Sequence, residues 1–167
     1  MSGPIHVPAG SGTRLPGPAP VFLIARSEWT DGRVCVIDQV MPPKSITPAH
    51  RHTVEAQGAY VLSGTLGFWV DGVEETVSAG GYLLRPAGSV HTQWNSSDEP
   101  AHLVEITSPA AGFQDFVLAI AAHVASGGGG DGIRAIADAH GTTFVEDVTA
   151  ELCRRYGVSA AGSGYSE

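Results

Sequence analysis

The stretch His50-Arg51-His52-Thr53-Val54-Glu55-Ala56-Gln57 decides how this chain folds. His50 and His52 are two residues apart, so on a β-strand both imidazoles leave the same face. Gln57 opens the next strand-like run, which continues to Gly64. Imidazole nitrogens together with an amide oxygen suit a borderline first-row metal ion. The stretch therefore predicts a β-strand that presents metal ligands.

A second segment, from Gly80 to Asn95, supplies a third imidazole. His91 follows Pro86-Ala87-Gly88, a turn that could bring its side chain back toward the first two histidines. The sequence then predicts one divalent transition metal ion, of Fe, Ni, Mn, Co or Zn, held by three imidazoles and one amide. The expected ligands are His50, His52, Gln57 and His91.

The spacing of these residues resembles that of the cupin family. His-x-His-x4-Gln-x6-Gly, read from His50 to Gly64, resembles the first cupin motif, and Gly80-x5-Pro-x-Gly-x2-His-x3-Asn95 resembles the second. The resemblance covers residues 21–107 and is to small single-domain cupins of the quercetin-dioxygenase-like type. It implies an all-β fold, the cupin double-stranded β-helix or jelly-roll barrel, with a C-terminal helical tail.

Strand signals in the middle of the chain agree with such a barrel. Asp71-Gly72 is a hairpin signal, because the favoured two-residue turn needs positive φ at both positions. Short apolar or alternating runs between turn residues predict eight strands: Val21–Ala25, Arg33–Val40, Ala59–Leu62, Thr65–Val70, Val73–Ser78, Tyr82–Arg85, His91–Asn95 and Ala101–Thr107.

The two ends of the chain differ from the middle. Residues 1–20 are rich in glycine and proline and predict a flexible arm, disordered or draped over a barrel of residues 21–109. Residues 110–167 predict a helical extension. Its first helix carries an apolar stripe from Phe113 to Val124 that should pack on the barrel or on a partner subunit. A later helix is expected to start at a capping box formed by Thr143 and Glu146.

Composition narrows the classes of function. The chain has 167 residues and a net charge of −8, with 9 Lys and Arg against 17 Asp and Glu, which disfavours nucleic acid as a partner. No apolar run reaches the length of a membrane span, so we expect a cytoplasmic protein without a membrane partner. Cys35 and Cys153 are far apart and form no disulfide framework.

The resemblance has one departure. The first cupin motif usually carries a glutamate where this chain has Gln57, and an amide cannot take a proton from a substrate. Glu55 lies two residues earlier and is the candidate catalytic base, or a competing ligand. Gln93 and Asn95 share the face of His91 by alternation, so they are candidate substrate-binding residues, with a packing role as the alternative.

Three functions remain open at this point. The resemblance favours a metal-dependent dioxygenase that cleaves an oxygenated aromatic or enol compound. A neutral Gln57 leaves the full charge on the metal, which favours a redox-neutral cyclase, isomerase, hydratase or lyase instead. The third possibility is a small-molecule-binding cupin without catalysis. In each case we expect a small-molecule ligand and a homodimer.

Overall fold

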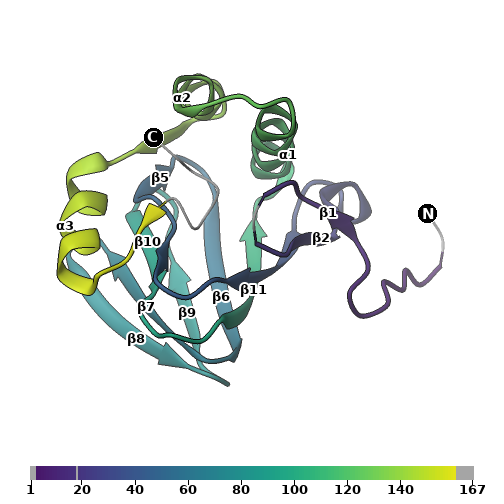
Figure 1. The fold of residues 1–167 in the computed structure, drawn as a ribbon. Coiled ribbons are helices and arrows are strands. Elements are labelled where there is room, and N and C mark those ends of the chain that lie inside the picture. Colours follow the sequence, from purple (N-terminus) through teal and green to yellow (C-terminus); the bar gives the residue numbers. More distant parts are fainter. Residues whose placement is uncertain (1–2, 18, 161–167) are drawn as a thin grey trace.

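Two antiparallel sheets form a jelly-roll barrel in the computed structural model, which describes residues 3–17 and 19–160 (Figure 1). The first sheet has six strands in the order β1-β2-β3-β11-β6-β9. They are β1 (Thr13–Arg14), β2 (Val21–Ala25), β3 (Cys35–Met41), β11 (Ala101–Ser108), β6 (Ala56–Ser63) and β9 (Tyr82–Arg85).

The second sheet runs β12-β5-β10-β7-β8, and β4 pairs with β10 beside it. Its strands are β12 (Thr142–Phe144), β5 (His50–His52), β10 (Val90–Asn95), β7 (Thr65–Val70), β8 (Val73–Ser78) and β4 (Ser45–Ile46). Asp71 and Gly72 join β7 to β8 with φ of 46° and 92°, as the hairpin signal predicts. The all-β prediction is confirmed, and the strands that it omitted are only two or three residues long.

Apolar side chains fill the space between the two sheets. The inward positions of β6, β7 and β11 alternate with outward ones, and Val61, Phe68 and Leu103 are fully buried there. This period of two is the pattern expected of strands with one face on a core. The alternation also decides which polar residues of these strands point into the barrel.

Helices close one end and one side of the barrel (Figure 1). α1 (Ala111–Ala125) and α2 (Gly130–Ala139) lie over the end at which β5 and β11 meet the helical region, and η1 (Ser27–Thr30) contacts α1. α3 (Glu146–Tyr156) lies beside the second sheet, where the Tyr156 ring stacks on Trp94 at a centroid distance of 4.6 Å. Phe113, Phe116 and Ile120 of α1 are buried against the chain's own barrel.

The predicted capping box of the last helix is wrong. Thr143 lies in β12 and pairs with Arg51 of β5, so it is not available as a cap. The N-cap of α3 is Val145, which makes no side-chain cap hydrogen bond. The helix ends at Gly157, which forms the C-cap with a φ of 62°. Strand pairing has overridden a local capping signal here.

The N-terminal segment lies against the barrel where the structure describes it. Thr13 and Arg14 pair with Leu23 and Phe22, and Leu15 is buried. Residues 1–2 and 18 of the expected arm, and residues 161–167 of the expected helical extension, lie outside the described residues. None of the helices in residues 3–17 and 19–160 combines the length and apolar character that crossing a membrane requires.

Candidate metal centre

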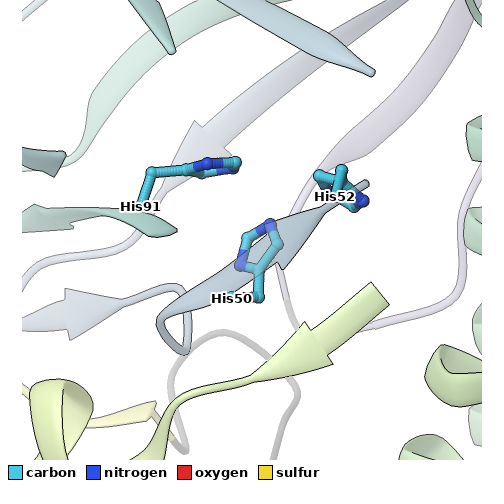
Figure 2. Close-up of side chains that lie close together, drawn as sticks. All are labelled: His50, His52 and His91. Atoms are coloured by element: carbon cyan, nitrogen blue, oxygen red, sulfur yellow. The ribbon is translucent and has the colours of Figure 1, made fainter. Parts of the chain in front are cut away.

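Three buried histidines from two neighbouring strands converge inside the barrel (Figure 2). His50 and His52 leave the same face of β5, while Arg51 between them is exposed. His91 of β10 lies directly opposite His50 in the antiparallel register. The centroid of the His50 ring lies 4.8 Å from that of the His52 ring and 4.6 Å from that of the His91 ring. One nitrogen from each of the three rings lies within 4.8 Å of the others.

The turn before β10 sets this register. Gly88 has a φ of 79°, which favours glycine, and its N–H donates to the carbonyl of His52 at 2.9 Å. Ser89 Oγ closes the turn by donating to the Pro86 carbonyl at 2.6 Å. These bonds hold the start of β10 beside the end of β5, so the third imidazole meets the first two.

Each imidazole has an outer partner on its Nδ1 atom. His50 Nδ1 lies 2.7 Å from the Pro48 carbonyl and His91 Nδ1 lies 3.1 Å from the Ser89 carbonyl. Carbonyl oxygens only accept, so both contacts suit the tautomer with the proton on Nδ1, which leaves a lone pair on Nε2 for a metal ion. His52 Nδ1 lies 2.9 Å from Thr142 Oγ1, and its buried Nε2 has no partner among the described residues. Such outer partners orient the imidazole ligands of metal sites.

Gln57 adds a fourth lone pair. Its Nε2 donates to Glu105 Oε1 at 3.2 Å, and because a carboxylate only accepts, this bond fixes which way the amide points. Gln57 Oε1 then faces His91 Nε2 at 2.9 Å. In the tautomer with the proton on Nδ1, His91 Nε2 and Gln57 Oε1 both offer a lone pair to an ion bound beside them. The geometry therefore fits a metal ion held by His50, His52, His91 and Gln57.

Burial keeps the imidazoles uncharged. Burial, together with the neighbouring His50 and Arg85, lowers the pKa of His52 to about 2. Burial also lowers the pKa of His50 and of His91. Neutral imidazole is the form that binds metals, so protons do not compete for these ligands near neutral pH.

Sequence reasoning missed two charged residues beside this centre. Arg85 Nη2 donates to Glu105 Oε2 at 2.7 Å, and both side chains are buried. Arg85 ends β9 directly opposite Gln57 of β6, and Glu105 occupies an inward position of β11. The available signal was the alternation of β11, which places Glu105 on the same face as Leu103 and Thr107.

Glu55 does not have the position that its predicted role requires. It is buried between β5 and β6, outside the group of three histidines, and it is not among the residues that line the cavity beside them. A Cβ atom placed on Gly112 would lie 3.1 Å from Glu55 Oε1, so this carboxylate faces the start of α1. Glu105 is the carboxylate that lines the cavity.

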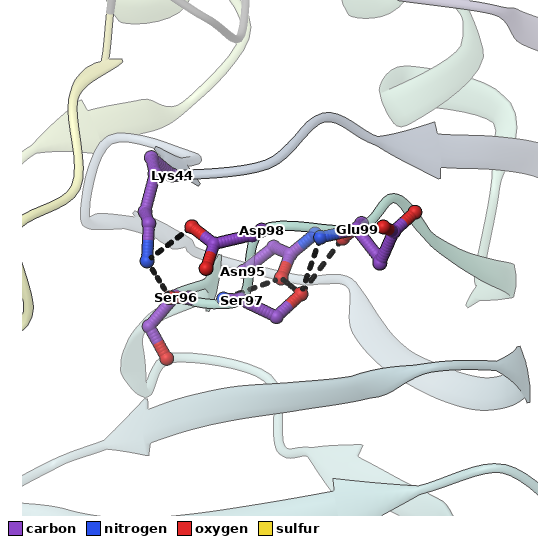
Figure 3. A network of polar contacts seen from close by, with 6 residues as sticks. All are labelled: Lys44, Asn95, Ser96, Ser97, Asp98 and Glu99. Atoms are coloured by element: carbon purple, nitrogen blue, oxygen red, sulfur yellow. Dashed lines mark hydrogen bonds and ion pairs between the residues drawn. The ribbon is translucent and has the colours of Figure 1, made fainter.

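The amide of Asn95, a predicted substrate-binding residue, is engaged by the protein itself, which favours the alternative packing role (Figure 3). Its Nδ2 donates to the carbonyls of Met41 and Glu99 at 3.1 and 2.8 Å. Its Oδ1 accepts from the N–H and the hydroxyl of Ser97 at 3.0 and 2.7 Å. With its donors and its acceptor engaged, the amide anchors the β10–β11 loop. Gln93, one alternation earlier, does line the cavity.

The cavity beside the histidines has a volume of about 150 Å³ and two unlike walls. The barrel contributes the polar wall, formed by His50, Gln57, Arg85, Gln93 and Glu105. The N-terminal segment, β2, β3 and α1 contribute an apolar wall that includes Leu15, Val21, Ile37, Phe113, Phe116 and Ile120. The apolar stripe of α1 therefore both packs on the barrel and covers the site.

Comparison with known proteins identifies the barrel. Residues 37–107 match the family model described as "Cupin domain", and the jelly-roll barrel agrees with this match. Quercetin 2,3-dioxygenase of Bacillus subtilis (strain 168) is 30% identical over 90 residues, 53% of this chain and 27% of that protein. Germin-like protein 5-1 of Oryza sativa subsp. japonica is 33% identical over 116 residues, 66% of this chain and 52% of that protein. The matches thus span about a quarter and about half of these relatives.

Solved structures agree on the fold. An RmlC-like cupin from Shewanella frigidimarina NCIMB 400 has a TM-score of 0.53 and 20% identity, over 66% of this chain and 96% of that one. A sugar phosphate isomerase of the cupin superfamily from Silicibacter pomeroyi DSS-3 also has a TM-score of 0.53, with 18% identity, over 62% and 75% of the two chains. At these identities the likeness shows the barrel architecture alone.

The metal site can be tested by metal analysis. We expect the purified protein to hold about one divalent ion per chain, because four lone pairs converge on one point. The His50→Ala/His91→Ala double variant should lose the ion, whereas His102→Ala should keep it, since His102 pairs with Asp38 outside the centre. Circular dichroism checks that each variant folds. Stoichiometric metal in the double variant would contradict the assignment.

Proposed function

We propose that this cupin domain is a metal-dependent enzyme that acts on a small organic molecule. The observation that carries the proposal is the convergence of His50, His52, His91 and Gln57 Oε1 at one end of a buried cavity. A divalent first-row metal ion bound there would polarise a substrate oxygen and supply a redox centre where the metal permits it. The apolar wall from α1 excludes water from the reacting groups.

Among the possible reactions we propose the dioxygenation of an enol or an oxygenated aromatic compound. Such a reaction needs a base for the substrate hydroxyl, and Gln57 cannot be that base. Glu105 lines the same cavity and can accept the proton, while Arg85 holds the carboxylate in place. The partial match to quercetin 2,3-dioxygenase supports this choice.

A redox-neutral isomerase, cyclase, hydratase or lyase is the second candidate. The favouring observation is the donor set of three neutral imidazoles and one neutral amide, which leaves the full positive charge on the metal. Such a centre stabilises an enolate without a change of oxidation state. A non-catalytic binding role is the third candidate, in which Glu105 serves only to orient Gln57 and to pair with Arg85.

Oxygen consumption separates these candidates. Metal-loaded protein is incubated without air with a panel of acyclic and one-ring enols, and oxygen uptake is recorded when air is admitted. We expect uptake with at least one enol, and a loss of about a hundredfold or more in Glu105→Gln, the usual scale for a general base. Glu55→Gln tests the carboxylate suggested by sequence and should keep the rate. Turnover without oxygen would select the redox-neutral candidate instead.

Exchange of the Gln57 and Glu105 side chains tests the amide as a ligand. In Gln57→Glu/Glu105→Gln the amide introduced at position 105 can donate to the carboxylate introduced at position 57 and accept from Arg85. Both hydrogen bonds are thus kept while the negative charge moves to the metal. We expect metal affinity to rise at least tenfold, measured by competition with a chelator. Gln57→Glu alone should gain less, because two carboxylates then face each other. Unchanged affinity in both variants would show that residue 57 does not bind the metal.

We also propose a homodimer, through the outer face of the first sheet. Five large apolar side chains are exposed there on neighbouring strands: Tyr60, Leu62, Tyr82, Leu84 and Ile106. Tyr60 lies opposite Tyr82 across β6 and β9, so the side chains form one patch. The stripe of α1, from which a dimer was first expected, is buried within the chain itself. A patch of this kind commonly marks an interface, and a second copy of the chain offers the same surface.

Sedimentation velocity tests the dimer. At micromolar concentration the protein is expected to sediment as a dimer, and Leu62→Glu/Leu84→Glu should sediment as a monomer, since the charges would have to be buried in the interface. Val54→Glu, an exposed apolar position in the β5–β6 loop, is a matched control that should leave the dimer intact. A monomeric wild-type protein would refute the proposal.

A further inference from the structure

Arg85 has more hydrogen-bond donors than the surrounding protein uses. The side chain is 2% exposed, and its ion pair with Glu105 engages Nη2. A guanidinium group carries five N–H donors, and Arg85 Nε has no partner among the described residues. Leaving such donors unpaired in a buried site is costly, so they point to a bound group that this chain does not itself supply.

Gln93 is a second underused polar side chain on the same cavity. It is 2% exposed, and its Oε1 has no partner among residues 3–17 and 19–160. It shares the inward face of β10 with His91, the metal-ligand candidate two residues earlier. Two buried polar side chains from different sheets thus line one cavity with hydrogen-bonding capacity to spare.

The chemistry of the walls selects the ligand. The planar fork of a guanidinium matches a carboxylate, and the bond is charge-assisted. Glu105 Oε1 accepts from Gln57 and Oε2 accepts from Arg85 Nη2, and neither oxygen accepts from Arg85 Nε. The phenyl rings of Phe113 and Phe116 on the opposite wall suit a hydrocarbon group. A volume of about 150 Å³ equals that of engineered cavities that take up benzene, so a hydrocarbon group of one ring fits here.

We infer that Arg85, beside Gln93, forms a subsite for the carboxylate of a small substrate whose hydrocarbon part, of about one ring, lies against α1. The inference rests on the proposed function in calling this ligand a substrate. The metal charge would favour the same anion, because the Arg85–Glu105 pair is neutral in sum and the imidazoles are uncharged. Gln93 Oε1 can in addition accept from a hydroxyl group on the ligand.

Calorimetric titration with benzoate and with benzamide tests the subsite. The two probes have the same size and differ in the charged oxygen. The protein is titrated as purified, with its metal, and again after chelation. We expect benzoate to bind at least tenfold more tightly than benzamide in both states. Arg85→Lys keeps the charge but loses the planar fork, and it should weaken benzoate at least tenfold. Arg26→Lys, at an exposed arginine paired with Glu28, should bind benzoate as the wild type does.

Gln93→Leu provides a second variant with nearly the same shape, which stays informative even if Arg85→Lys does not fold. It should weaken 3-hydroxybenzoate about threefold or more and bind benzoate as the wild type does, because Gln93 Oε1 accepts only from the hydroxyl group. The inference is overturned if benzoate and benzamide bind equally, if neither binds at millimolar concentration, or if Arg85→Lys binds benzoate like the wild type. Benzoate that binds only with the metal present, and equally to Arg85→Lys, would place the carboxylate on the metal. That outcome rejects the subsite but not the proposed metal enzyme. If the purified protein holds no metal and still binds benzoate through Arg85, the metal enzyme is rejected and the subsite is kept.

Discussion

The hydrogen bond from Gln57 Nε2 to Glu105 Oε1 determines the character of this site. An amide has a donor end and an acceptor end of the same shape, and only its neighbours decide which end faces which way. Glu105 accepts at one end, so the oxygen must face His91. Arg85 in turn holds Glu105 by a buried ion pair. Without this chain of contacts, the Gln57 amide could turn its N–H group toward the histidines, and the centre would then repel a cation.

Both sheets are needed to build this arrangement. β5 and β10 of the second sheet carry the histidines, while β6, β9 and β11 of the first sheet carry Gln57, Arg85 and Glu105. Because side chains alternate along a strand, a slip of one residue in either sheet would turn its polar residues out of the barrel. The apolar core between β6, β7 and β11 fixes both registers at once. The packing that stabilises the fold thus also positions the chemistry.

The sequence predicted the features that depend on local spacing. β2, β7, β8 and β9 have the predicted bounds, and the three histidines meet as their strand period and the Pro86–Gly88 turn suggested. It could not predict contacts that depend on pairing between distant strands. Glu105 and Arg85 were missed because nothing in the spacing relates them to Gln57, although the register of β6 brings all three together. Glu55 was favoured over Glu105 as the catalytic base because it is near Gln57 in the sequence. Asn95 was favoured as a substrate-binding residue because alternation predicts which face a side chain takes, but not which protein groups already bond to it.

A carboxylate that is displaced from the metal changes what the site can do. In the usual cupin arrangement implied by the motif, one glutamate would both bind the ion and accept a proton, and each role weakens the other because the metal withdraws the lone pairs. Here Gln57 is placed to bind and Glu105 to accept, at the cost of an arginine that competes for the same carboxylate. If an anionic substrate binds Arg85 as inferred above, it would share this guanidinium group with Glu105. Binding of the substrate and the proposed base would then be coupled through one residue.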